Sequence, residues 1–204
     1  MYTTFNTSFN IGLVSVMVLT VGFGMVMSSA ASAAPSGGRS EPRVVENVDL
    51  NRYLGRWYEI ARIPVWFQKD CACGTTAEYT LVKDGVVSVV NRCCTSDGEM
   101  KEAKGRAWVV DKKIPAQLKV SFFSLFGFWL FGGHYWIIDL DPDYRYAVVG
   151  HPKRTLGWIL SRTPQLSQEV LDGIAERLEA NGYSFSQFRM SDQAECTCTP
   201  PDRQ

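Results

Sequence analysis

The sequence predicts an all-β protein with one C-terminal helix: an eight-stranded antiparallel up-and-down β-barrel with an α-helix packed on its outside. Between residues 44 and 163, short β-branched and aromatic runs alternate with turn residues, at the spacing typical of an antiparallel meander. Asp84-Gly85 and Asp97-Gly98 are pairs that favour tight hairpins. One amphipathic segment follows the last run, and it fits a helix on the outer wall of a closed barrel.

The N-terminal segment is typical of an export signal. Residues 11–27 are almost wholly apolar, and the small residues Ser28–Ala33 suit signal peptidase, so we expect a signal peptide over 1–33. The alternative is an uncleaved anchor, because residues 1–10 lack Lys and Arg. No Cys follows the apolar run, so no lipid-anchor cysteine is expected. We expect an exported protein that is periplasmic, in the cell envelope or secreted.

After this segment the chain divides into three parts. Residues 34–43, rich in Pro, Gly and Ser, predict a flexible lead-in. Residues 44–193 predict the barrel and its helix, and 194–204 a disulfide-tethered tail. Eight runs are expected as strands: Arg56–Ile63, Thr75–Val82, Val86–Cys94, Lys101–Val110, Gln117–Phe123, His134–Leu140, Tyr144–Gly150 and Thr155–Arg162.

The helix is expected directly after the last strand. Ser167 is a suitable N-cap, and Asn181-Gly182 a suitable end. The apolar residues between them recur at helical spacing and require a surface to cover them: Val170, Leu171, Ile174 and Leu178.

The six cysteines are expected to form disulfides, because an exported chain meets an oxidising compartment. A zinc site is a weak alternative, since neither C-x-C nor C-C has the C-x-x-C spacing that zinc sites favour. Fifteen pairings are possible. Bonds from the last two cysteines to earlier ones would attach the tail to the barrel. The residues concerned are Cys71, Cys73, Cys93, Cys94, Cys196 and Cys198.

Charge argues against a polyanionic partner. Lys plus Arg and Asp plus Glu each number 21, so the chain carries no overall field that attracts nucleic acid. No nucleic-acid partner is expected.

Three segments carry a family resemblance. Leu54–Glu59 reads Leu-Gly-Arg-Trp-Tyr-Glu, a G-x-W-Y pattern; Leu140–Tyr144 and Trp158–Arg162 follow in order. Together they resemble the lipocalin family over roughly Val48–Gln193, most closely bacterial outer-membrane-type lipocalins and apolipoprotein D. The resemblance implies a barrel that binds a small hydrophobic ligand, with no enzymatic activity, metal or cofactor.

The resemblance also implies roles for single residues. It places Tyr79 and Tyr135 in the ligand pocket, and it implies a disulfide from the Cys71 or Cys73 region to Cys196. Cys93 would then pair with a cysteine of the first loop. Bacterial relatives often carry a lipidated N-terminal cysteine, which this chain lacks.

Gly55, Trp57 and Arg162 are expected to close one end of the barrel. The indole is large enough to plug a narrow end, Gly55 lets the entering backbone pass close, and Arg162 can lie across the ring. We interpret all three as structural residues.

Strand alternation extends from these residues to the cavity wall. An inward Trp57 would turn Glu59, Ala61 and Ile63 inward, although Glu59 would need a backbone or Arg partner. An inward Arg162 brings Leu160 and Trp158 inside. The predicted ligand-binding residues are Tyr79, Trp158, Tyr135, Ala61, Leu118, Val120, Phe122 and Leu160. The alternative is that these rings fill the barrel and leave no cavity.

The loops after the first, third, fifth and seventh strands should meet at the open end. The fifth-strand loop, Ser124–Gly133, is unusually apolar, and an apolar surface of this kind marks an interaction site. We expect peripheral membrane contact; a lid over the mouth or a dimer contact are alternatives, so the chain would be a monomer or weak homodimer. The predicted membrane-facing residues are Trp66, Phe67, Phe126, Phe128, Trp129, Phe131, Lys153 and Arg154.

The function predicted from these features is binding, with transport or storage, of a fatty acid or (lyso)phospholipid for envelope lipid maintenance. The alternatives are a lipocalin-type enzyme, and a haem or pigment carrier that uses His134 as axial ligand. Paired cysteines are not nucleophiles, and neither His134 nor His151 has an evident acid–base partner. No catalytic residue is therefore predicted.

Overall fold

The computed structural model of the protein describes residues 40–194, 196 and 198 of the 204-residue chain. The expected signal peptide and nearly all of the expected lead-in lie outside the described residues, as does most of the expected tail. Within the described part, no helix is both long and apolar enough to cross a membrane.

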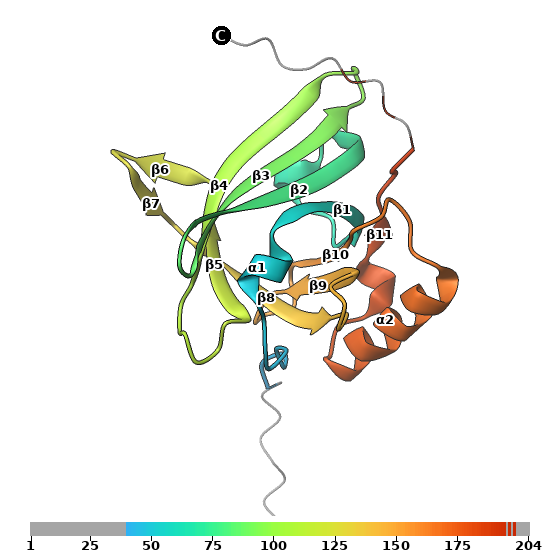
Figure 1. Ribbon diagram of the computed structural model, residues 1–204. Coiled ribbons are helices and arrows are strands. Elements are labelled where there is room, and N and C mark those ends of the chain that lie inside the picture. The colour runs from blue at the N-terminus through green and yellow to red at the C-terminus, as the bar shows by residue number, and fades with distance from the viewer. Residues whose placement is uncertain (1–39, 195, 197, 199–204) are drawn as a thin grey trace, which may run out of the picture. The chain divides into compact units, whose positions relative to one another are not determined.

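Eight strands form one closed antiparallel barrel (Figure 1). Each strand pairs with the next, and β10 pairs with β1 to complete the circle. This confirms the predicted fold, and every expected strand overlaps an observed one. The barrel strands are β1 Gly55–Arg62, β2 Cys71–Lys83, β3 Val86–Thr95, β4 Met100–Val109, β5 Gln117–Ser121, β8 Gly133–Leu140, β9 Tyr146–Gly150 and β10 Gly157–Ser161.

The two predicted Asp-Gly hairpins are present. Gly85 and Gly98 have φ of 71° and 78°, the left-handed region that tight reversals require and that glycine enters without strain. A third reversal joins β8 to β9, where the Asp141 carboxylate accepts hydrogen bonds from the backbone N–H of Asp143 (3.0 Å) and Arg145 (3.1 Å). These turns therefore connect consecutive strands as antiparallel hairpins.

A β-bulge in β1 changes which side chains face the cavity. Glu59 lies opposite Leu160, but Ala61 lies opposite Ile159, so one extra residue stands on β1. Ile60 and Ala61 therefore both pack outside the barrel, in the buried cluster that α2 covers. The expectation that Ala61 and Ile63 line the cavity is wrong, because the bulge reverses the alternation.

The C-terminal helix α2 (Gln168–Ala180) covers the outer wall of the barrel (Figure 1). The Ser167 hydroxyl accepts from the Val170 N–H, as an N-cap does, and the helix ends at Asn181. Leu171, Ile174 and Leu178 are buried, which confirms the predicted apolar stripe.

Several shorter elements were not expected. A one-turn helix precedes β1, a small hairpin interrupts the path from β5 to β8, and the chain after α2 returns to the barrel. These elements are α1 Leu50–Tyr53, the 3₁₀ helices η1 Trp66–Gln68 and η2 Phe185–Gln187, and the strands β6 Phe123–Leu125, β7 Phe128–Leu130 and β11 Arg189–Met190.

The segment after η2 fills a gap in the barrel wall. β2 pairs with β1 only up to Tyr58, and beyond that point β11 pairs with β1 instead. The Gly74 N–H of β2 donates to the Asp192 carbonyl at 2.8 Å. The Gln193 side-chain amide donates to the carbonyls of Glu59 (2.7 Å) and Thr75 (2.8 Å), so it bridges the separated strands.

Candidate functional site

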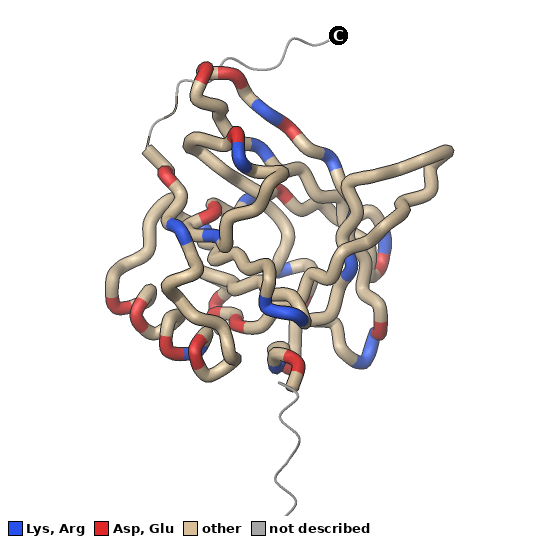
Figure 2. The backbone as a smooth tube through the Cα atoms, turned by 180° about the vertical axis from the view of Figure 1, so that it is seen from behind, with Lys and Arg blue, Asp and Glu red and all other residues tan. Residues whose placement is uncertain are grey.

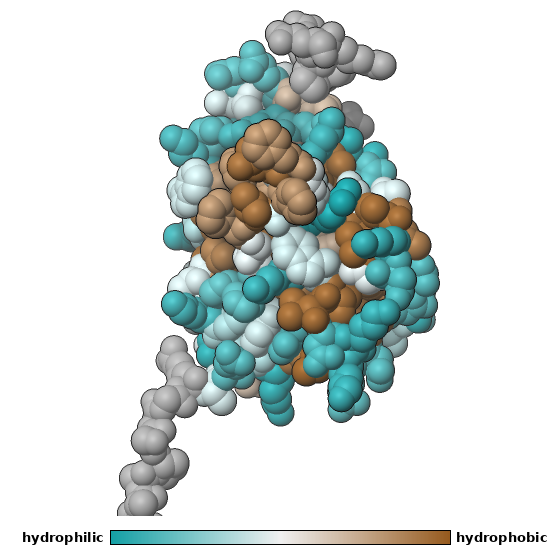
Figure 3. Space-filling model, turned by 90° about the vertical axis from the view of Figure 1, so that its left-hand side faces the viewer, coloured by the Kyte–Doolittle hydropathy of each residue, from teal (hydrophilic) through white to brown (hydrophobic). Residues whose placement is uncertain are grey.

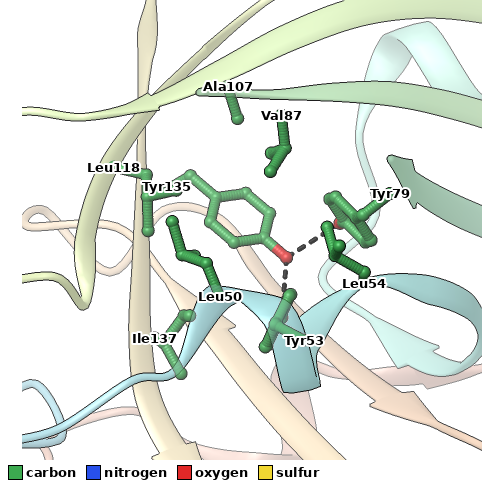
Figure 4. Close-up of a pocket in the computed structure, with 9 residues that line it drawn as sticks. All are labelled: Leu50, Tyr53, Leu54, Tyr79, Val87, Ala107, Leu118, Tyr135 and Ile137. Atoms are coloured by element: carbon green, nitrogen blue, oxygen red, sulfur yellow. Dashed lines mark hydrogen bonds between the residues drawn. The ribbon is translucent and has the colours of Figure 1, made fainter. Parts of the chain in front are cut away.

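A small pocket lies inside the barrel, beside the closed end where α1 enters (Figure 4). Its lining combines aliphatic side chains with three tyrosines and includes no charged residue. The free space between these side chains is small, close to what one water molecule needs. The lining residues are Leu50, Tyr53, Leu54, Tyr79, Val87, Ala107, Leu118, Tyr135 and Ile137.

The three tyrosines form one hydrogen-bonded chain. The Tyr135 hydroxyl lies 2.9 Å from the Tyr53 hydroxyl and 2.8 Å from the Tyr79 hydroxyl (Figure 4). Burial raises the pKa of Tyr79 to about 12 and the pKa of Tyr53 and Tyr135 well above the ordinary value. The cluster is therefore uncharged at any physiological pH and offers only neutral hydroxyls.

Tyr53 is the residue that sequence reasoning missed. It lies on the one-turn helix α1, which Asp49 caps by accepting from the Asn51 N–H, and it is only 3% exposed. A helix of one turn has no apolar periodicity to detect. The usable signals are the Asp49 N-cap and the position of a tyrosine two residues before the G-x-W-Y pattern.

Trp57 and Arg162 pack against each other next to this cluster. Trp57 is fully buried, and its indole N–H donates to the Tyr53 carbonyl at 2.8 Å. The Arg162 guanidinium lies 3.8 Å from the centre of the indole and donates to the carbonyls of Arg52 (2.7 Å) and Arg56 (2.9 Å). Gly55 has φ of 90°, and a Cβ there would face Arg162.

The other expected lining residues lie at different heights in the barrel. Leu118 and Leu160 are buried in the inner core, and Val120 and Trp158 are partly buried against it. Phe122 stands further up and is 45% exposed. Its ring fills the space that a side chain at position 105 would need: a Cβ on Gly105 would lie 2.7 Å from Phe122 Cδ1.

A polar network lies on β1 above the pocket. Glu59 is 3% exposed, and its carboxylate accepts from Arg62 (2.7 Å), Gln68 (2.9 Å) and Ser191 (2.5 Å). Gln68 in turn accepts from the Trp158 indole N–H at 3.0 Å. The expected partner for the buried carboxylate is thus present, supplied by the bulge that turns Arg62 inward.

The apolar fifth-strand loop forms the hairpin β6–β7, which projects away from the barrel (Figure 1). Phe126, Phe128 and Phe131 of this hairpin are 92%, 71% and 88% exposed. Figure 3 shows a hydrophobic patch on the side of the molecule from which the hairpin projects. Figure 2 shows no charged residue on the hairpin. Trp129 differs from the expectation because its ring packs over the Arg106 guanidinium, 5.4 Å away.

The remaining expected membrane-facing residues divide into two groups. Trp66 and Phe67, on the β1–β2 connection, are 82% and 45% exposed, and Lys153 is exposed. Arg154 is not the free cation that was expected: its guanidinium donates to the carbonyls of Asn181 (2.8 Å) and Ser40 (2.6 Å). The Asn181 carbonyl is an acceptor at the C-terminal end of α2, and the Ser40 carbonyl belongs to the segment that precedes the barrel.

All six cysteines are paired in disulfides. The bonds are Cys71–Cys93, Cys73–Cys196 and Cys94–Cys198, a set that includes the connection from the first loop to Cys196 implied by the family resemblance. The sulfur atoms of Cys73, Cys94 and Cys196 lie within 4.8 Å of one another. As disulfides they have no thiolate to offer as a nucleophile or a metal ligand.

The two histidines lie outside the cavity. His134 lies opposite Lys119 on the face of the sheet opposite to Leu118 and Tyr135. Its ring is 5.5 Å from that of His151, and burial lowers the pKa of His151. His134 is therefore not placed to act as an axial ligand for a pigment inside the barrel.

Comparisons with known proteins agree on one family. Residues 48–193 match the family described as Lipocalin-like domain. Temperature-induced lipocalin-1 of Arabidopsis thaliana is 37% identical over 167 residues, which cover 80% of this chain and 88% of that protein. Outer membrane lipoprotein Blc of Escherichia coli K12 is 38% identical, with the same two coverages. Apolipoprotein D of Cavia porcellus is 34% identical and covers 88% of this chain and 95% of its own length.

A solved structure agrees with the fold. Insecticyanin from the tobacco hornworm Manduca sexta superposes with a TM-score of 0.63 over 81% of this chain and 94% of that chain. Its sequence identity is 22%, so this likeness supports the barrel architecture alone.

Proposed function

This chain belongs to the lipocalin family, whose members bind small hydrophobic ligands, and from that premise we propose that its barrel transports or stores a fatty acid or (lyso)phospholipid for envelope lipid maintenance. The observation that carries the proposal is the uncharged pocket, in which aliphatic side chains surround three hydroxyls. An apolar cavity with a few convergent polar groups is the usual form of a site for such ligands.

The positions of the lining residues along the barrel axis indicate how a long ligand would be oriented in the cavity. The pocket beside the tyrosines is small, so an acyl chain must extend upward past Val120 and Trp158 toward Phe122. The ring of Phe122, which is held by the absence of a side chain at Gly105, then contacts the ligand near the mouth. The proposed ligand-binding set is therefore Tyr79, Tyr135, Leu118, Val120, Leu160, Trp158 and Phe122, with Tyr53 added.

Export is part of the proposal. Three disulfides persist in an oxidising compartment and not in a reducing cytosol, which agrees with the expected signal peptide. Several relatives are named as outer membrane lipoproteins. We place the mature protein in the periplasm, the cell envelope or the medium.

The decisive experiment is native mass spectrometry of the protein purified from its own host, followed by organic extraction. A stoichiometric acyl lipid supports the proposal and identifies the class. A protein that carries nothing, and that fails to take up fluorescent fatty acids or lysolipids, contradicts it and indicates a barrel filled by its own side chains.

We also propose that the β6–β7 hairpin docks on lipid membranes. The hairpin carries exposed phenylalanines and no charged residue. Lys153 is exposed and can contact phosphate head groups. Aromatic and aliphatic residues that enter the interface in this way provide binding that scales with the apolar area buried.

Vesicle co-sedimentation tests the docking surface. Phe126→Ser/Phe131→Ser should abolish sedimentation with phosphatidylcholine–phosphatidylglycerol vesicles while leaving the thermal unfolding of the barrel unchanged. Val110→Ser is the matched control, because Val110 is 58% exposed on the β4–β5 connection, at the opposite end of the strands. Undiminished sedimentation of the double variant would contradict the proposal. A wild-type dimer that becomes a monomer in the double variant, measured by size-exclusion chromatography without vesicles, would favour a dimer contact instead.

A further inference from the structure

The three tyrosines always leave one hydroxyl proton without a partner. Each hydroxyl has one proton, and the chain from Tyr53 through Tyr135 to Tyr79 uses two of the three protons, whichever way the bonds point. Among the described residues, none of these hydroxyls has another hydrogen-bond partner. One donor is therefore left over for a ligand in every arrangement.

No positively charged side chain lines the pocket beside this donor. The closest guanidinium on the closed side, Arg162, lies against Trp57 and donates to backbone carbonyls. Arg62, on the open side, is paired with Glu59. A carboxylate beside the tyrosines would therefore lose its hydration and gain only one neutral hydrogen bond, which is strongly unfavourable.

We propose that the base of the barrel binds one uncharged oxygen of the ligand, a hydroxyl or a carbonyl at the end that enters first, and excludes a carboxylate. The proposal rests on the proposed function and narrows it to ligands with a neutral polar atom at the buried end. Fatty alcohols, ketones and hydroxylated or carbonyl-bearing polycyclic lipids have this chemistry. A fatty acid must bind in the opposite orientation, with its carboxylate toward the mouth.

The size of the pocket agrees with this assignment. The space beside the hydroxyls is close to that of one water molecule, which suits a single terminal oxygen and not a branched or hydrated head group. The raised pKa of all three tyrosines keeps them protonated, so the spare donor is present throughout the physiological range.

The test compares three ligands of one chain length, 1-dodecanol, dodecane and dodecanoate, by displacement of a fluorescent probe at about pH 8, where the acid is ionised. The protein should bind dodecanol about tenfold more tightly than dodecane, the factor expected for one neutral hydrogen bond. Tyr53→Phe/Tyr79→Phe/Tyr135→Phe should remove this preference and leave the affinity for dodecanoate unchanged. The triple variant removes every partner together, so it leaves no unpaired hydroxyl that would unfold the barrel.

Two further variants make the test specific. Tyr135→Phe alone should keep the preference for the alcohol, because it leaves Tyr53 and Tyr79 with two free donors. Tyr146→Phe is the matched control, since the Tyr146 hydroxyl accepts from Arg177, on the outside of the barrel. Thermal unfolding of each variant shows whether the barrel is intact.

The outcomes separate the two proposals. If none of the three ligands binds the wild-type protein, the proposed function itself fails. If they bind but dodecanol has no advantage over dodecane, the function stands and the tyrosine site is overturned. The site is also overturned if the triple variant loses affinity for dodecanoate as much as for dodecanol, because the carboxylate would then bind at the tyrosines.

Discussion

At the scale of single residues, Arg162 contacts three parts of the chain at one end of the barrel: α1, the start of β1 and the indole of Trp57. Its guanidinium covers the Trp57 ring at 3.8 Å and donates to the carbonyls of Arg52 and Arg56, which belong to the entry into β1. Hydrogen bonds from a charged donor contribute about 1.5–3 kcal/mol each, and the cation–π contact about 0.5–2 kcal/mol. The residue thus connects the end of β10 to α1 and the start of β1.

Arg162→Ala should lower the free energy of unfolding by about 3 kcal/mol, because the carbonyls lose their donor and the indole loses its cover. Urea denaturation followed by tryptophan fluorescence measures the loss. Arg177→Ala is the matched control: that guanidinium lies 5.7 Å from the Tyr146 ring, is 46% exposed, and should cost about 1 kcal/mol or less. Equal losses in the two variants would contradict the closing role of Arg162.

Asp141 should make the barrel sensitive to acid. The Arg145 side chain, together with the backbone N–H groups of Arg145 and Asp143, lowers the pKa of the Asp141 carboxyl below its ordinary value. A lowered folded-state pKa means that the ionised carboxylate stabilises the fold at pH above about 4, the value in the unfolded chain. That contribution is lost as the pH falls through the folded-state pKa.

Asp141→Asn should therefore be less stable than the wild type at neutral pH, and the difference should shrink as the pH falls through the folded-state pKa and the wild-type carboxyl is neutralised. Urea denaturation at a series of pH values measures both curves. If the difference in the free energy of unfolding between the two proteins is the same at every pH, the contribution of Asp141 comes from its shape and hydrogen bonds and not from its charge.

At the scale of elements, Gly150 fixes the contact between the barrel and the chain that follows α2. A Cβ at this position would lie 2.5 Å from the Tyr183 hydroxyl and 2.9 Å from Ile138. That hydroxyl donates to backbone carbonyls and accepts from the His151 N–H at 2.7 Å, so it has little freedom to move.

Gly150→Ala should lower the free energy of unfolding by about 2–3 kcal/mol through overpacking. Gly133→Ala, also in the barrel wall, is the matched control, because the nearest atom to its added Cβ is 3.9 Å away. Thermal unfolding of the two variants should give a large shift for the first and almost none for the second. Similar shifts would mean that the loss comes from the glycine itself and not from the contact with Tyr183.

The same scale shows what the sequence predicts well. The eight strands and α2 follow from alternation, Asp-Gly turns and the Ser167 cap, all of which are local signals. The bulge in β1 is different, because Ile60 and Ala61 are both apolar and either fits the inside or the outside. Both residues face outward because they pack against α2 on the outer wall. This packing joins residues that are more than 100 positions apart, so no local pattern predicts it.

The candidate site was predicted in part for a similar reason. Tyr79 and Tyr135 lie on strands of the barrel, and the family resemblance implies that both face the pocket. Tyr53 lies on a one-turn helix, and its contact with Tyr135 spans 82 residues. The polar network on Glu59 needed the bulge that brings in Arg62, so its donors were not predictable from the alternation pattern.

At the scale of the whole molecule, the C-terminal segment completes the barrel wall. It lies between the separated parts of β1 and β2, where Ser191 and Gly74 N–H groups join it to both strands. Cys73–Cys196 and Cys94–Cys198 then fasten its end to β2 and β3. Because the two bonds hold the same segment, each keeps it in place when the other is absent.

Removing the two bonds should therefore be strongly non-additive. Cys73→Ser/Cys196→Ser and Cys94→Ser/Cys198→Ser should each lower the free energy of unfolding by about 1 kcal/mol. The fourfold variant should lower it by about 3–5 kcal/mol, because it releases a loop of more than 100 residues. In the fourfold variant, hydrogen exchange should accelerate at the Gly74 and Ser191 amides, whose acceptors lie across the gap, and remain slow in the β3–β4 pairing. If the two double variants instead add up to the fourfold loss, each disulfide constrains the unfolded chain independently. The segment would then be held in the wall by its backbone and Gln193 hydrogen bonds, and not by the disulfides.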